Sequence, residues 1–181
     1  ATPGLQQMLT MIKGAFGSER LLTLIRDYTY FPDDKYNKEQ EVICRYPQFF
    51  ATTKLFRHIV NKIKSSKNDG KGGTYFGATG CGKTFTMLFL SRHLQLRAKT
   101  SLGSPTIIVI VDRDELQNQA MTLFQNSEEF LSCGNVKMIT SRAELKDELK
   151  YRASGGVLIC TIQKFCEEIG LLSERNNIIC F

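Results

Sequence analysis

One short stretch near the middle of the chain carries the clearest chemical signal. Residues Gly77 to Thr84 read G-A-T-G-C-G-K-T and fit the phosphate-loop pattern G-x-x-x-x-G-K-[ST]. The glycines let the backbone turn tightly and bring N–H groups close to phosphate oxygens. The lysine of this pattern reaches the β- and γ-phosphates, and the hydroxyl group after it binds Mg²⁺. The stretch therefore predicts nucleotide binding, with Lys83 and Thr84 in these two roles.

The motif needs a strand before it and a helix after it. Residues 74–76 form a short run that leans apolar and predicts a buried strand. A helical pattern follows from Phe85 to about Lys99, so the positive end of its dipole would face a bound phosphate. This order of strand, glycine loop and helix argues against a chance match.

The composition is that of a globular protein with a basic surface. The length of 181 residues suits one domain with a good core, with or without an appended subdomain, and the shares of hydrophobic (42%) and charged (23%) residues are ordinary. The net charge of +6 permits a nucleic acid partner. It fits equally well a basic surface that does not bind nucleic acid. The cysteines lack C-x-x-C spacing, so we expect buried thiols in a reducing cytoplasm rather than zinc ligands or disulfides. No apolar run is long enough to span a membrane, so we do not expect a membrane among the partners of this chain.

Apolar runs alternate with helical patterns along most of the chain. Strands are expected at residues 106–112, 136–140, 156–161 and 178–181. Helices are expected at residues 18–28, 46–65, 114–125, 141–151 and 162–169. The unbroken β-branched run that begins at Thr106 is typical of a strand buried on both faces of a parallel sheet. The alternation predicts an α/β fold in which helices flank a parallel sheet.

A phosphate-loop enzyme that hydrolyses its nucleotide also needs a carboxylate at a strand end to hold Mg²⁺. Asp112 ends the run at 106–112, but Arg113 follows it directly and would compete for its carboxylate. Residues 178–181 form an equally good strand, whose acidic end would lie just past the chain terminus. Both placements of the acidic partner stay open.

Five stretches of the sequence point to one family of motor proteins. They are S-E-R-L-L-T-L-I-R-D-Y-T-Y-F from Ser18, R-Y-P-Q from Arg45, the phosphate loop within residues 72–87, V-D-R-D-E-L-Q-N-Q from Val111, and G-V-L-I-C-T-I-Q-K-F from Gly156. They resemble the motor (R) subunit of type I restriction endonucleases, a superfamily 2 helicase-like DNA translocase. In order, they match its pre-motor segment, its R-Y-x-Q adenine motif, motif I, the V-D-R-x-D-L-x-x-Q motif Ia and the T-I-Q-K-F motif Ib. The likeness covers most of residues 18–181.

The resemblance implies a RecA-like P-loop NTPase domain that uses ATP and Mg²⁺. Gln48 would hydrogen-bond the adenine edge through its amide, with help from Arg45, and Lys83 would be the catalytic residue. The loop residues expected to contact the nucleotide are Thr79, Gly80, Cys81, Gly82, Lys83, Thr84 and Phe85, of which Thr84 also binds Mg²⁺.

The resemblance also implies a path for one DNA strand along motifs Ia and Ib. The candidate contacts, mainly to phosphates, are Arg113, Gln119, Thr161, Gln163 and Lys164. Two other interpretations stay open. Arg113 is equally suited to an ion pair with Asp112 or Asp114, and Gln163 and Lys164 to the surface start of a helix.

The chain is expected to be a fragment of this subunit. Residues 1–40 would form a linker with helical character, and residues 41–181 the first RecA-like motor domain, cut off before the D-E-x-H box that holds Mg²⁺. The whole subunit couples ATP hydrolysis to translocation and cleavage of double-stranded DNA, together with specificity and methyltransferase subunits. This fragment alone is not expected to hydrolyse ATP well. Glu115 and Cys81 depart from the family pattern, which has Asp and commonly Ser at these positions.

Three alternatives remain. The chain could belong to another superfamily 2 motor, such as a type III restriction subunit or a repair helicase. It could be a small P-loop kinase with Asp112 as its acidic partner. It could also be a degenerate structural domain that binds no nucleotide.

Overall fold

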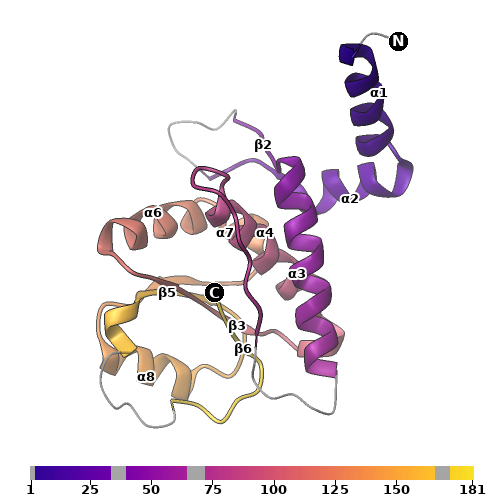
Figure 1. The fold of residues 1–181 in the computed structure, drawn as a ribbon. Helices are drawn as coiled ribbons and strands as arrows, with labels where there is room; N and C mark the ends of the chain where they lie inside the picture. Colours follow the sequence, from indigo (N-terminus) through magenta and orange to yellow (C-terminus); the bar gives the residue numbers. More distant parts are fainter. Residues whose placement is uncertain (1–2, 34–39, 65–71, 166–171) are drawn as a thin grey trace.

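A parallel sheet forms the centre of the molecule (Figure 1). The computed structural model describes residues 3–33, 40–64, 72–165 and 172–181. The four-stranded sheet has the order β4 (Val136–Met138), β5 (Val157–Thr161), β3 (Thr106–Val111) and β6 (Ile178–Cys180). Each neighbouring pair of strands runs parallel. The predicted α/β fold with a parallel sheet is therefore confirmed.

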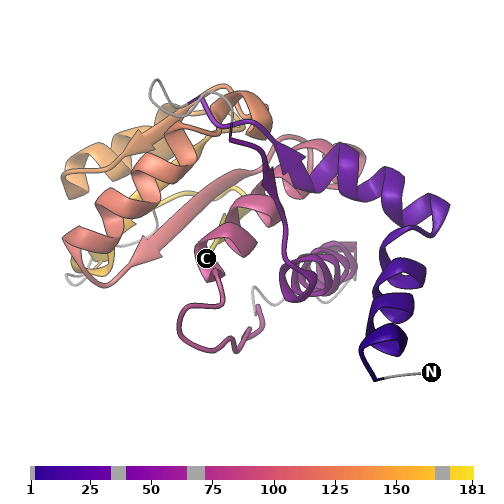
Figure 2. The ribbon, with the colours of Figure 1, turned by 90° about the horizontal axis from the view of Figure 1, so that it is seen from above.

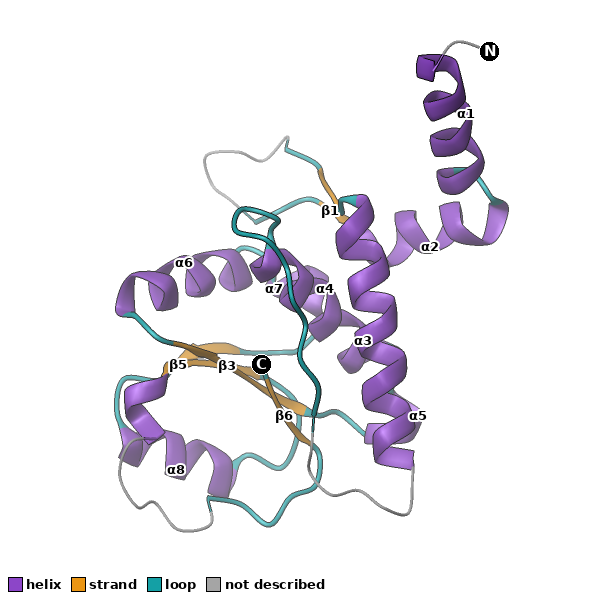
Figure 3. Cartoon of the chain, in the orientation of Figure 1, coloured by secondary structure: helices purple, strands orange, loops and turns teal. Residues whose placement is uncertain are grey.

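The two faces of the sheet are covered by different helices. Successive side chains of β3 point to opposite faces, so Ile107 and Ile108 belong to separate apolar clusters. Helix α8 (Arg142–Tyr151) packs Leu145 and Leu149 against the face that carries Ile108 (Figure 3). The other face packs against α4 (Lys83–Leu96) and α6 (Asp114–Gln125).

The remaining elements lie around this core. Helix α3 (Tyr46–Lys64) packs against α4 and is seen nearly along its axis in Figure 2. The other elements are α1 (Pro3–Ala15), α2 (Ser18–Tyr28), β1 (Thr29–Tyr30), β2 (Val42–Ile43), α5 (Lys99–Leu102), α7 (Glu128–Leu131) and the 3₁₀ turn η1 (Ile162–Phe165). Helix α1 projects away from the sheet and has no buried residue (Figure 1). Within the described ranges, no helix is both long enough and apolar enough to cross a membrane.

Residues before the predicted domain boundary contribute to the core. Tyr28 and Tyr30 are buried with α4, and Tyr30 stacks on Phe130 with ring centroids 4.3 Å apart. Strand β1 pairs antiparallel with β2, across the division expected between residues 40 and 41. That division stays a prediction about domain limits.

One expectation beside the phosphate loop is wrong, and one predicted helix is present with shifted limits. Residues 74–76 pair with none of the described strands, and Phe76 is 91% exposed. The run is short, and Tyr75 turns its ring towards Gly77 instead of into a sheet. The helix after the loop begins at Lys83 and ends at Leu96, and residues 99–102 form the separate helix α5.

An ion-pair cluster joins α2 to the carboxyl-terminal half of α4. The carboxylate of Asp27 is 2% exposed and receives Nη2 of Arg97 at 2.6 Å and Nη2 of Arg26 at 2.9 Å. Burial alone would raise the pKa of Asp27, but the two guanidinium groups outweigh it and hold the pKa below its ordinary value. Arg92 adds a hydrogen bond to the Arg26 carbonyl at 3.0 Å and lies 4.1 Å above the ring of Phe130. The cluster therefore fixes α4 against both α2 and α7.

His93 lies next to this cluster in an aromatic environment. Its ring centroid is 4.8 Å from that of Tyr28 and 5.5 Å from that of Phe56. Its Nε2 atom is buried and has no hydrogen-bond partner among the described residues. Burial lowers the pKa of His93 to about 4, and the nearby charge of Asp27 opposes only part of this effect. The neutral imidazole is therefore the form that the folded chain favours.

Replacement of Asp27 by Ala should lower the free energy of unfolding at pH 7 by about 2 kcal/mol. The loss stays below that of a fully buried pair because both arginines reach solvent, with side chains 57% and 38% exposed. Urea denaturation measures the change. Asp112→Ala is the matched control, because it removes an ion pair whose side chains are 63% and 76% exposed and should cost less than about 0.5 kcal/mol. Equal losses in the two variants would contradict the role of the buried cluster.

The His93→Phe variant should lose part of the acid sensitivity of the chain. An unfolded His93 binds a proton below pH 6.5, whereas the folded one does so only below about 4. The free energy of unfolding of the unaltered chain should therefore fall as the pH drops from 6.5 to about 4. Urea titrations at pH 7 and pH 4.5 should show a smaller difference for His93→Phe. Identical differences for both chains would refute this account.

Candidate functional site

The phosphate loop turns on two glycines with left-handed backbone. Gly80 has φ of +77° and Gly82 has φ of +79°, which residues with a Cβ rarely adopt. Gly82 directly precedes α4, and its carbonyl accepts the Thr86 N–H at 3.1 Å as the first bond of the helix. The N–H groups of the first helical turn have no acceptor within the helix and carry the positive end of its dipole. The start of α4 is therefore suited to an anion.

The side chain of Lys83 folds back onto the first residues of the phosphate loop. Its Nζ donates hydrogen bonds to the carbonyls of Gly77 at 3.0 Å and Ala78 at 3.1 Å. The side chain is exposed, and among the described residues, apart from the two chain neighbours of Gly80, no atom lies within 4 Å of the position that a Cβ on Gly80 would take. The loop thus combines a cation, free helical N–H groups and open space, which are the features that a nucleotide phosphate requires. These residues fit a nucleotide, and Thr84, whose side chain is half-buried, is the loop hydroxyl predicted to bind Mg²⁺.

The other residues predicted to contact the nucleotide surround the same turn. Thr79 is exposed, and Cys81 is half-buried with its Sγ close to Gly77. Phe85 extends from the first turn of α4 towards Phe89, with ring centroids 6.5 Å apart. The structure therefore brings Thr79 to Phe85 together around one turn, and their contacts with a nucleotide stay predictions.

Gln48 reaches the loop from the first turn of α3. It is 5% exposed. Its Oε1 accepts the Arg45 N–H at 2.7 Å, and its Nε2 donates to the Gly82 carbonyl at 3.2 Å. Sequence reasoning placed Gln48 and Arg45 at the adenine but did not foresee this contact, because the two bonded residues are 34 positions apart. The adenine role of both residues stays a prediction.

Asp112 and Arg113 form an ion pair directly after β3. Nε of Arg113 lies 3.5 Å from Oδ2 of Asp112, and both side chains are largely exposed. This is the pairing that the sequence left open for Arg113. It leaves the guanidinium group accessible from solvent.

The ends of three parallel strands meet through side chain to backbone hydrogen bonds. Gln163, which follows β5, donates Nε2 to the carbonyl of Asp112 after β3 at 2.9 Å. Arg142, which follows β4, donates Nη2 to the carbonyl of Gln163 at 3.1 Å. Arg142 was not among the predicted site residues, and the signal for it is a basic residue shortly after a third parallel strand. Gln163 and the half-buried Lys164 therefore lie at one edge with Arg113.

Two predicted DNA contacts are placed less favourably. Thr161 is 2% exposed at the end of β5, so its side chain presents little surface to a ligand. Gln119 is exposed in the second turn of α6 rather than at a strand end. No contact with DNA is tested by this geometry, and all five roles stay predictions.

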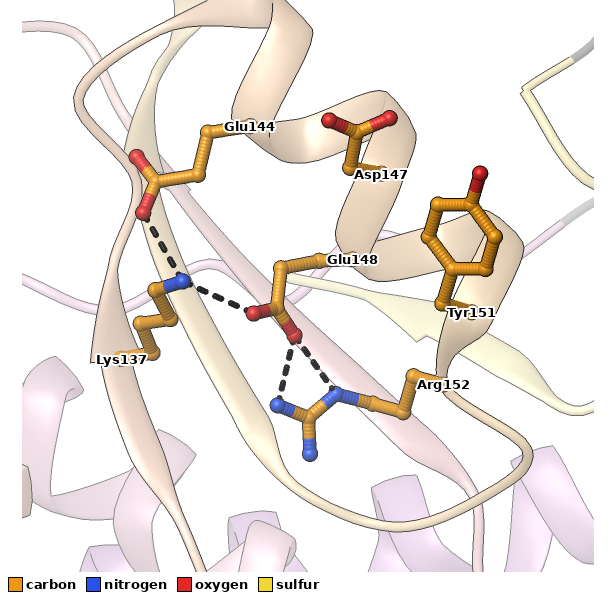
Figure 4. A pocket seen from close by; sticks show the side chains of 6 residues that line it. All are labelled: Lys137, Glu144, Asp147, Glu148, Tyr151 and Arg152. Carbon is orange, nitrogen blue, oxygen red and sulfur yellow. Dashed lines mark hydrogen bonds and ion pairs between the residues drawn. The ribbon is translucent and has the colours of Figure 1, made fainter.

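A hollow of about 660 Å³ lies between α8 and the edge strand β4 (Figure 4). Four of its charged groups are paired with one another: Lys137 lies 2.9 Å from Glu144 and 2.8 Å from Glu148, and Arg152 lies 2.7 Å from Glu148. The Thr140 N–H and then Lys137 lower the pKa of Glu144 to about 2. Helix α8 is thereby fixed to β4. The hollow is remote in sequence from the phosphate loop, and its ion pairs hold α8 against β4.

Comparison with known proteins gives the chain its family. The model of the SWI2/SNF2 ATPase family matches residues 47–181. The chain is 29% identical, over 96% of its length, to the type I restriction enzyme HindI endonuclease subunit of Haemophilus influenzae. It is 31% identical, over 73% of its length, to the putative type I restriction enzyme MjaVIIIP endonuclease subunit of Methanocaldococcus jannaschii.

The chain spans only 16% and 13% of the length of these two relatives. Similarity to restriction enzyme subunits therefore concerns one part of much longer proteins. The family match starts one residue before Gln48 and includes the phosphate loop and all four strands of the parallel sheet. From this match and the RecA-like α/β fold, we conclude that the chain belongs to the SWI2/SNF2 ATPase family.

Proposed function

We propose that this chain binds ATP and is the first motor domain of a type I restriction endonuclease subunit. The observation that carries the proposal is the glycine turn at the start of α4, with Lys83 Nζ held over the loop. Membership of an ATPase family and similarity to named type I endonuclease subunits support it. Residues 41–181 would be the motor domain.

The roles of the loop residues follow from their positions. Lys83 would exchange its two carbonyl acceptors for phosphate oxygens and offset their negative charge. The free N–H groups at the start of α4 would bind the same phosphates. Thr84 would hold a Mg²⁺ ion from the loop, and the ion would supply positive charge that offsets the charge of the phosphates. The chain thus positions the nucleotide and lowers the electrostatic cost of binding it.

The edge where β3 and β5 end is the proposed path for one strand of double-stranded DNA. Arg113 is exposed there, and the hydrogen bonds of Gln163 hold the loops after the two strands together. Lys164 adds a second cation. In the whole protein, ATP hydrolysis would drive translocation along DNA and cleavage, in a cytoplasmic complex with specificity and methyltransferase subunits. Free thiols at Cys44, Cys81, Cys133, Cys160 and Cys180 fit a reducing compartment.

Removal of the loop lysine should abolish most nucleotide binding. In calorimetric titrations with Mg-ATP, Lys83→Ala should bind at least about tenfold more weakly, because it loses a charge-assisted contact with the phosphates. Lys99→Ala, which removes an exposed lysine of α5, should bind as the unaltered chain does. Equal affinities of all three chains would refute the site. Phosphoryl transfer to a small acceptor by the chain alone would instead favour a P-loop kinase.

Loss of either cation at the proposed DNA path should change the salt dependence of DNA binding. Arg113→Ala and Lys164→Ala should each reduce the slope of log K against log salt concentration by about 1. Fluorescence anisotropy with duplex DNA, at several salt concentrations, measures this slope. Lys99→Ala is again the control, because Lys99 precedes β3 and so lies at the opposite end of that strand from Arg113. An effect of Lys99→Ala as large as the others would point to non-specific attraction.

A further inference from the structure

The Gly82 carbonyl is an unusual acceptor, because two different helices bind it. It accepts the Thr86 N–H at 3.1 Å, which starts the hydrogen-bond ladder of α4. It also accepts Nε2 of Gln48 at 3.2 Å, from the first turn of α3. The orientation of the peptide group after Gly82 is therefore set both from within α4 and from outside it.

Gln48 is itself held from the opposite side. Its Oε1 accepts the Arg45 N–H at 2.7 Å, so each polar atom of the amide is bonded to the main chain. The side chain is 5% exposed. An amide that is buried and bonded at both ends has little freedom to turn, and a swing towards a ligand would break both hydrogen bonds.

The absence of a side chain at Gly82 makes room for this amide. A Cβ built on Gly82 would collide with Nε2 of Gln48. Gly82 also has φ of +79°, so the backbone conformation and the contact with Gln48 both favour glycine there. The glutamine amide and the glycine turn are thus complementary in both shape and hydrogen bonding.

From this interlock we infer that Gln48 is a positioning residue for the phosphate loop and acts on phosphate binding whatever the base. Its amide fixes the turn at Gly82. That turn orients the first N–H groups of α4, and the side chains of Lys83 and Thr84, towards the phosphate site. The inference rests on the proposed function, because it concerns the same nucleotide site. The inference differs in its consequence from a role in adenine recognition. Loss of the Gln48 side chain should weaken the binding of every ligand that has a diphosphate group.

A test needs ligands that share the phosphates and differ in the base. We would titrate the 181-residue chain with Mg-ADP, Mg-GDP and Mg-pyrophosphate, which has no base. Gln48→Met keeps the length of the side chain and removes both hydrogen bonds. Gln95→Met is the matched control on α4, because Gln95 is also buried and also donates to a backbone carbonyl, that of Pro105 at 2.7 Å.

Gln48→Met should weaken the binding of all three ligands by a similar factor, roughly five- to tenfold for the loss of a structuring hydrogen bond. Gln95→Met should leave the three affinities unchanged. A loss confined to Mg-ADP, with Mg-GDP and Mg-pyrophosphate unaffected, would overturn the inference and assign Gln48 to the adenine. Unchanged affinities in Gln48→Met would overturn it as well.

Amide hydrogen exchange of the ligand-free chain gives a readout that does not depend on nucleotide binding. Gln48→Met should raise the exchange rate of residues 80–86, and Gln95→Met should not. Gln48→Glu serves as a second variant, since an ionised carboxylate still accepts the Arg45 N–H but cannot donate to Gly82. Unaltered exchange in both Gln48 variants would refute the inference. If the unaltered chain binds none of the three ligands, the proposed function fails, and the exchange result alone decides the role of Gln48.

Discussion

The shape of the phosphate loop depends on the left-handed turn at Gly82. That single residue ends the loop, starts the hydrogen-bond ladder of α4 and offers its carbonyl to α3. A residue with a Cβ would face an unfavourable φ and a collision with Gln48 at the same time. In the G-K-T end of the motif, the glycine sets the backbone conformation, and that conformation positions Lys83 and Thr84.

The sheet was the most predictable part of the fold. The unbroken apolar run at 106–111 is buried at its start and lies between β5 and β6, as its β-branched composition indicates. The helices with clear signals also appear where they were expected, and α2 (Ser18–Tyr28) and α6 (Asp114–Gln125) have the predicted limits. In these segments, local preference and tertiary packing favour the same structure.

Elements that depend on distant partners were missed. The two-residue strands β1 and β2 are too short to leave a pattern, and they exist because Thr29 pairs with Ile43 across a connection in the chain. Residues 74–76 show the opposite error: their composition suits a strand, yet among the described strands none pairs with them. A strand requires a hydrogen-bonding neighbour, and the sequence of the run itself contains no information about that neighbour.

The site shows the same division between local motif and distant contact. Lys83 and Thr84 follow from the motif alone, because their spacing is built into one turn of the chain. The bond from Gln48 to Gly82 and the edge formed by Arg142, Gln163 and Asp112 join segments that are far apart in sequence. Such contacts arise only once the sheet has brought the segments together. The residue types were visible in the sequence, but their partners were not.

Helix α4 connects these two levels. Its first turn carries Lys83 and Thr84, the residues proposed to bind phosphate and Mg²⁺, and Arg97 at its far end is paired with the buried Asp27. Between them, Leu88, Phe89 and Leu94 are fully buried, so the helix is in contact with the core along its length. One helix therefore joins the phosphate loop to α2, through its buried side chains and the pair between Arg97 and Asp27.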